Sequence, residues 1–262
     1  MQRRVLARTT SSGSGSAGVP VPAMDLRVRL ETPWLPRLLA ERAVTSVLQP
    51  IINLESGARV GVEALMRGNL DGEERSALEI LEAARAHELL FTMDVVAWTA
   101  ALDQGLPRLG PDERLHVNLL PTAVDEPDTY LATTQALARR DDLARVVVEI
   151  AEADGAETRM SAIADGHRAL GARVALDRAC GGLRTLRHID TIRPDMVKLD
   201  MGLTLGLTPD DARVAVVRAI VEQARAAGAL TVAVGIESAA ACLTLRELGV
   251  DLGQGYFLGR PQ

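Results

Sequence analysis

Short β-branched runs alternate with longer amphipathic runs from about residue 43 to the end of the sequence. Apolar runs of this length predict strands, and the amphipathic runs between them predict helices. The predicted strands are 46–54, 58–66, 114–119, 144–150, 172–177, 195–200, 230–236 and 250–255. The clearest predicted helices are 77–90, 129–140, 159–171 and 212–228.

The lengths of the connections predict the topology. Only Glu55, Ser56 and Gly57 separate the first two strands, which is a hairpin length, so we expect that pair to be antiparallel. The later strands are connected through helices and should be parallel with right-handed crossovers. The pattern favours an α/β fold, a TIM-like (β/α)8 barrel with one antiparallel strand. An open doubly wound sheet stays the alternative, because strand count alone does not show closure.

The first part of the chain has a different composition from the rest. Residues 10–23, TSSGSGSAGVPVPA, are rich in Gly, Ser and Pro and cannot bury enough apolar surface to order themselves. We therefore expect residues 1–24 to form a flexible leader and residues 25–262 to form the barrel domain.

Composition excludes several classes of protein. Hydrophobic residues make up 47% of the 262 residues, an ordinary share for a globular protein, but aromatic residues only 2%. The net charge of -6 argues against a DNA- or RNA-binding surface, and no apolar run is long enough to cross a bilayer. Cys180 and Cys242 are isolated, which is typical of reduced thiols in a cytoplasmic protein.

Polar side chains stand at or near the end of most predicted strands. They are Glu63, Asn118, Glu149, Glu152, Asp177, Lys198, Asp200, Glu237 and Gln254. The carboxyl ends of barrel strands converge on one mouth, where active sites lie. A single polar residue at a strand end is usually structural, but six or more strands ending in this way indicate a functional site.

The residue types at this mouth suit a metal and a phosphate ester. Glu63, Asn118, Glu149 and Asp177 offer hard oxygen ligands, which Mg²⁺ or Mn²⁺ prefer and zinc does not. Lys198 could orient an attacking water or neutralise a phosphate oxygen. Arg67 could hold a phosphate with its guanidinium, although a surface salt bridge explains that residue equally well. The histidines (His87, His116, His167 and His188) are scattered and are expected to be structural.

Several motifs, in order along the chain, resemble those of the EAL domain family, phosphodiesterases that cleave cyclic di-GMP to a linear dinucleotide. Gly61 to Arg67, GVEALMR, resembles the family's signature, and Gln49-Pro50-Ile51 its QPI stretch. Further matches are VNL at 117–119, EIAE at 149–152, VKLD at 197–200, and QGYF with GRP at 254–261. The resemblance extends from about Trp34 to Pro261 and implies a TIM-like barrel with an antiparallel strand.

The resemblance also implies roles for individual residues. Glu63, Asn118, Glu149 and Asp177 would bind the first metal ion, and Lys198 would contact the catalytic water. Gln254 would support the site, and Glu152 would brace the loop after Asp177. Glu237 matches the second acid of the family's AEGVE stretch, and Gln49 and Arg67 would contact the dinucleotide.

The chain lacks an acidic residue of the family pattern at two positions. The family's DDFGTG is here DRACGG, so Arg178 replaces the second aspartate, and AEGVE is here AVGIE, so Val234 replaces the first glutamate. Both losses affect the second metal ion, so we expect one Mg²⁺ or Mn²⁺ site and no second one. We hypothesise that Arg178 replaces the second cation and pairs with a phosphate oxygen. Alternatively, Arg178 points to solvent or pairs with Glu152 or Glu237, and the site is eroded.

Three functions remain open from the sequence. The favoured one is a receptor that binds cyclic di-GMP with little or no hydrolysis. The second is an active metal-dependent phosphodiesterase giving linear pGpG, and the third is a protein-interaction module that no longer binds nucleotide. A homodimer and a separate protein partner both stay open.

Overall fold

The computed structural model describes residue 29 and residues 31–120, 127–153 and 155–262. The expected leader, residues 1–24, and the expected start of the domain at residue 25 lie outside the described residues. Within the described chain, no helix is both long enough and apolar enough to cross a membrane.

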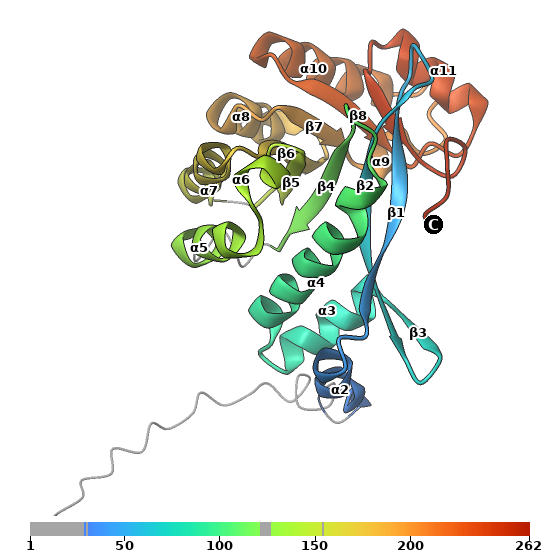
Figure 1. Cartoon of the computed structure of the whole chain (residues 1–262). Helices are drawn as coiled ribbons and strands as arrows, with labels where there is room; N and C mark the ends of the chain where they lie inside the picture. The colour runs from blue at the N-terminus through green and yellow to red at the C-terminus, as the bar shows by residue number, and fades with distance from the viewer. Residues whose placement is uncertain (1–28, 30, 121–126, 154) are drawn as a thin grey trace, which may run out of the picture.

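Eight strands form a closed barrel, which confirms the predicted fold class over the open-sheet alternative (Figure 1). They are β1 (Val44–Asn53), β2 (Arg59–Leu70), β4 (Arg114–Leu119), β5 (Val146–Ala151), β6 (Arg173–Ala179), β7 (Met196–Leu199), β8 (Leu230–Val234) and β9 (Leu252–Gln254). The barrel closes because β1 pairs with both β2 and β9. A ninth strand, β3 (Glu73–Ser76), pairs with β2 outside the barrel.

The one reversed strand is β1, which runs antiparallel to both of its neighbours, while all other pairs in the barrel are parallel. The predicted hairpin after it is confirmed. The Asn53 side-chain oxygen accepts hydrogen bonds from the backbone N–H groups of Glu55 (3.1 Å) and Ser56 (2.8 Å). Gly57 follows at a φ of 72°, a left-handed conformation that glycine adopts without strain.

Helices surround the barrel on its outer side (Figure 1). They are α2 (Trp34–Ala40), α3 (Ala77–Ala86), α4 (Leu90–Gly105), α5 (Pro127–Leu137), α6 (Arg140–Leu143), α7 (Glu157–Leu170), α8 (Gly182–Ile192), α9 (Met201–Thr204), α10 (Arg213–Ala227) and α11 (Ala239–Glu247), with a 3-10 turn at Leu106–Arg108. The predicted helix 77–90 is wrong in its length. Ser76 and Glu79 form a capping box that begins α3, and Glu88, at a φ of 57°, separates α3 from α4.

Apolar packing occurs in three places. The largest cluster lies between the sheet and the helices and includes Leu115, Val148 and Leu176. A second cluster joins α2 and α3 to the outer ends of β1 and β2. The third lies inside the barrel and fills its lower part, below the site described next.

Candidate functional site

Alternate side chains of each barrel strand point inward, so each strand supplies an inner position near its start and another near the mouth. The lower inner positions are mostly apolar and include Ile51, Val147, Ala175, Met196, Val232 and Leu252. The positions two residues nearer the mouth hold Gln49, Glu63, Asn118, Glu149, Asp177, Lys198, Val234 and Gln254. Seven strands therefore offer a polar group at the mouth, and β8 offers a valine.

Lys198 lies at the centre of this polar layer and is 2% exposed. Its Nζ is 2.6 Å from Glu149 Oε2, 2.9 Å from Glu63 Oε2 and 3.8 Å from Asp177 Oδ1. Burial works against the charged amine, but the charges of Glu149, Glu63 and Asp177 raise the pKa of Lys198 above its ordinary value. Lys198 is the only lysine in the sequence, beside 28 arginines. Its ammonium is a compact charge with three donors, so it can contact several close carboxylates at once.

Glu63 is held by three donors. Lys198 and Gln254 (2.7 Å) donate to its Oε2, and the Asn118 amide donates to its Oε1 at 2.8 Å. Burial opposes ionisation of Glu63, but the Lys198 charge and these hydrogen bonds lower its pKa from 4.5 to about 2. The Trp98 indole N–H fixes the strand from outside by donating to the Asn118 carbonyl at 3.0 Å.

Glu149 is held differently, by Lys198 on one oxygen and by His116 on the other. His116 Nδ1 lies 2.8 Å from Glu149 Oε1, and His116 is 1% exposed. Burial and the charge of Glu63 raise the pKa of Glu149 well above its ordinary value. Burial and the Lys198 charge lower the pKa of His116 to about 3. The sequence did not predict this contact, because the histidines were expected to be structural. The available clue was that His116 lies two residues before Asn118, so the two side chains point to the same face of the strand.

Asp177 and Arg178 form an irregularity at the end of β6. The pairing with β7 shifts between Leu176 and Ala179, and Arg178 has a φ of 60°. The Arg178 side chain is 75% exposed, with Nε 3.8 Å from Asp177 Oδ2. Among the described residues, Asp177 is its ion-pair partner; neither Glu152 nor Glu237 takes that place.

Glu152 lies just after β5, with its side chain 3% exposed. Its Oε2 is 3.4 Å from Arg184 Nε, and the Cys180 thiol points to the same oxygen at 3.9 Å. Its Oε1 is 3.4 Å from Nδ1 of the buried His188. Glu152 thus contacts both the loop after β6 and α8.

Of the remaining predicted residues, Glu237 and Arg67 lie away from the central cluster, and Gln49 lies at its edge. Glu237 is exposed on the segment between β8 and α11. Arg67 lies four residues beyond Glu63, where its Nη1 donates to the Met66 carbonyl at 2.8 Å. Gln49 is closer, since its Oε1 accepts from Gln254 Nε2 at 3.1 Å and its own amide donates to the Gly259 carbonyl at 3.2 Å.

The donor chemistry of the mouth suits a hard divalent cation. When ionised, Glu63, Glu149 and Asp177 together with the Lys198 ammonium carry a net charge of about minus two, which one Mg²⁺ or Mn²⁺ would neutralise. Over the part of the chain that the structure describes, however, no three His, Cys, Asp or Glu side chains are grouped so as to hold a metal ion. Lys198 lies between the carboxylates, so metal binding requires it to release at least one of them.

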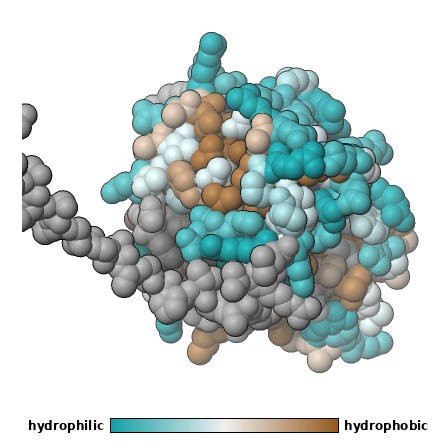
Figure 2. All heavy atoms as spheres, turned by 90° about the horizontal axis from the view of Figure 1, so that it is seen from below, coloured by the Kyte–Doolittle hydropathy of each residue, from teal (hydrophilic) through white to brown (hydrophobic). Residues whose placement is uncertain are grey.

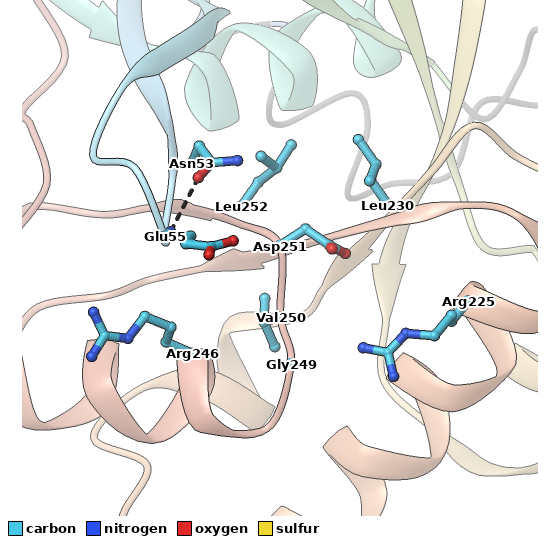
Figure 3. Close-up of a pocket in the computed structure, with 9 residues that line it drawn as sticks. All are labelled: Asn53, Glu55, Arg225, Leu230, Arg246, Gly249, Val250, Asp251 and Leu252. Atoms are coloured by element: carbon cyan, nitrogen blue, oxygen red, sulfur yellow. Dashed lines mark hydrogen bonds between the residues drawn. The ribbon is translucent and has the colours of Figure 1, made fainter.

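A separate hollow of about 550 Å³ lies at the opposite end of the barrel, where β8 and β9 begin (Figure 3). Arg225 and Arg246 face it from the last turns of α10 and α11, and Glu55 and Asp251 line it as well. The Asp251 carboxylate already accepts hydrogen bonds from Thr231, both at 2.8 Å. The hollow has balanced charge and shares no residue with the mouth, so it is not part of the candidate site.

A closed (β/α)8 barrel with a cluster of carboxylate, amide and lysine side chains at its mouth defines a TIM-type barrel protein. The family model described as EAL domain matches residues 33–261, so the chain belongs to the EAL domain family.

Individual relatives agree with this assignment. The chain is 25% identical over 235 residues to the cyclic di-GMP phosphodiesterase TpdA of Vibrio parahaemolyticus, covering 88% of this chain and 39% of TpdA. The chain spans less than half the length of the curated relatives that it matches.

Solved structures show the same fold. The EAL domain of Xanthomonas citri FimX, in complex with c-diGMP, gives a TM-score of 0.78 at 23% identity, covering 92% of this chain and 96% of that one. A standalone EAL protein of Vibrio cholerae, in a c-di-GMP-bound form, gives 0.71 at 27% identity, covering 83% of this chain and 92% of that one.

Proposed function

We propose that this protein binds cyclic di-GMP at the barrel mouth and hydrolyses it slowly or not at all. Membership of a family with cyclic di-GMP phosphodiesterases among its relatives supports the ligand class. The polar layer contributed by seven strands supports retention of binding. The loss of acids at Arg178 and Val234 supports the loss of turnover.

In this proposal, one Mg²⁺ or Mn²⁺ is held by Glu63, Asn118, Glu149 and Asp177. The ion would neutralise phosphate charge and polarise a phosphoryl oxygen when bound. Lys198, released from one carboxylate, faces the phosphate or a water, and Gln254 keeps Glu63 oriented. Gln49 and Arg67 contact the dinucleotide, and Glu152 braces the loop after Asp177.

The observation that carries the proposal is the position of Arg178. Its guanidinium is exposed at the mouth and lies 3.8 Å from Asp177. Two acidic residues in the family pattern have become one cation and one apolar residue, a change of three charge units toward positive. A second dication has no carboxylate on β8 to bind, because Val234 takes the position in register with Gln254. The arginine instead offers a fixed positive charge to a phosphate oxygen.

Location and assembly belong to the same proposal. The two cysteines are free thiols, which is in keeping with a cytoplasmic location.

An apolar surface bears on assembly. The arrow of β4 points downward in Figure 1, so the face seen from below in Figure 2 is the face on which the parallel strands end. Figure 2 shows an apolar area among hydrophilic residues on that face. Leu183, Met201, Tyr256 and Phe257, which follow β6, β7 and β9, are between 49% and 80% exposed. Such surface suits a homodimer or another protein partner.

The test is a titration of the purified protein with cyclic di-GMP, with and without Mg²⁺ or Mn²⁺, together with an assay for linear product. We expect saturable binding without appreciable product, and weaker binding for Arg178→Ala. Arg218→Ala, an exposed arginine on α10, is the matched control and should bind as the wild type does.

The outcomes of this titration separate the three functions. Rapid metal-dependent formation of pGpG contradicts the proposal and supports the active phosphodiesterase, which the intact Lys198 and first-metal residues favour. Absence of binding under all conditions supports the protein-interaction module instead.

A further inference from the structure

His116 is the polar exception in the lower inner layer of the barrel. At the lower positions the other strands carry Ile51, Gly61, Val147, Ala175, Met196, Val232 and Leu252. His116 pairs in register with Val147 on one side and with Glu63 on the other. A buried imidazole among apolar side chains is unfavourable unless its polar atoms find partners. His116 has one, the Glu149 carboxylate directly above it.

The contact completes a symmetric arrangement around the single ammonium. Each of the two glutamates gives its Oε2 to Lys198, at 2.9 Å for Glu63 and 2.6 Å for Glu149. Each is also held on its Oε1, by Asn118 for Glu63 and by His116 for Glu149, both at 2.8 Å. His116 thus does for Glu149 what the Asn118 amide does for Glu63.

This hydrogen bond fixes the rotation of the Glu149 carboxylate. With Oε1 held by His116 of the neighbouring strand β4, Oε2 stays directed at Lys198 in the centre of the mouth, where a cation would compete with the ammonium. Without His116, Oε1 would be a buried acceptor with no partner, and the carboxylate would be free to turn. A turned carboxylate would no longer direct Oε2 at the position of a hard cation.

We infer that His116 is a positioning residue, which donates its Nδ1–H to Glu149 and thereby holds that carboxylate ready for a divalent cation. The inference rests on the proposed function, because it assumes that Glu149 binds the metal. Loss of such a supporting hydrogen bond typically weakens metal affinity about 10- to 100-fold.

The test measures Mn²⁺ affinity by electron paramagnetic resonance of the free ion. His116→Ala should weaken Mn²⁺ binding by about 10- to 100-fold. His116→Asn, whose amide nitrogen can reach the position of Nδ1, should restore most of it. Met196→Ala, at the lower inner position of β7, also removes a large side chain but no hydrogen bond to Glu149, and should stay within about 3-fold of the wild type.

A second measurement tests the hydrogen bond between His116 and Glu149 in the absence of metal. Long-range ¹H–¹⁵N spectra of the four histidines should show the His116 ring protonated at Nδ1. A ring protonated only at Nε2 overturns the inference, and this result does not depend on the folding of any variant.

The outcomes also separate this inference from the function on which it rests. A wild-type protein that binds neither Mn²⁺ nor cyclic di-GMP contradicts the proposed function. A wild-type protein that binds Mn²⁺, with His116→Ala binding equally well or His116→Asn no better than His116→Ala, contradicts the role of His116 alone.

Discussion

Replacing Lys198 by methionine removes the charge at the centre of the mouth while keeping most of the side-chain length. The substitution leaves Glu63 and Glu149 facing each other without the ammonium that both contact. Removing one partner of a buried ion pair costs about 3 to 5 kcal/mol, because a buried charge is left without compensation.

The pKa of Glu63 gives an independent magnitude. It lies at about 2, against an ordinary value of 4.5, even though burial works in the opposite direction. At 1.36 kcal/mol per pKa unit, this difference corresponds to about 3 kcal/mol of stabilisation of the ionised form. Lys198 is the main source of that stabilisation, so we expect Lys198→Met to be less stable than the wild type by about 3 to 5 kcal/mol at pH 8.

The sign of the pH dependence follows from the same groups. In the wild type, the stabilisation from Glu63 is present above pH 4.5 and is lost as pH falls toward 2. In Lys198→Met, burial raises the pKa of the glutamates above the unfolded value, so stability falls as pH rises above about 4.5. The deficit relative to the wild type should therefore be larger at pH 8 than at pH 4.5.

Urea unfolding followed by circular dichroism at the two pH values measures this deficit. Adding Glu63→Gln to Lys198→Met removes one of the orphaned charges and should restore part of the stability, which a double-mutant cycle quantifies. Mn²⁺ should also stabilise Lys198→Met if the mouth binds metal. A deficit below about 1 kcal/mol at pH 8, or an equal deficit at both pH values, would refute the reasoning.

Three further predictions concern other residues. The double variant Arg178→Asp with Val234→Glu restores both missing acids and should gain metal-dependent cleavage of cyclic di-GMP; a folded but inert double variant would mean that the loop after β6 is also altered. Arg178 and Arg193 both have a positive φ, of 60° and 46°. Replacing either by glycine should therefore raise the free energy of unfolding by about 1 kcal/mol, measured in urea, whereas only Arg178→Gly should weaken cyclic di-GMP binding. Burial raises the pKa of Asp94 from 3.8 to about 7, so the wild type should lose stability between about pH 4 and 7. Asp94→Asn should lack that loss and be more stable than the wild type at pH 8, by up to about 4 kcal/mol, whereas equal pH profiles for the two proteins would contradict the prediction.

Much of the barrel could be predicted because each strand is marked by its own apolar run and each crossover by its length. The reversed strand followed from three residues, Glu55 to Gly57. The break between α3 and α4 could not be predicted, because it depends on Glu88 adopting a left-handed conformation, which no residue type there requires. Closure of the sheet could not be derived from the strands alone either, because it depends on the pairing of β1 with β9.

The candidate site was predictable where strand parity and side-chain chemistry agree, as for Glu63, Asn118, Glu149 and Lys198. His116 was not predicted as a site residue, because a lone histidine in a strand is usually structural. Only the register between β4 and β5 brings it to Glu149. Likewise, the shift in pairing at Asp177 and Arg178 depends on β7 and cannot be read from β6 alone.

Because the sequence contains one lysine, chemical modification or isotope labelling of lysine reports on Lys198 alone among the side chains. Amine-directed reagents can attack only its Nζ and the α-amino group of the chain, and Nζ is shielded while it contacts the two glutamates. The rate at which Nζ is modified therefore measures how often the mouth opens. A spectrum of protein labelled in lysine nitrogen contains a single side-chain signal, which would follow the arrival of a cation or a phosphate without any mutation.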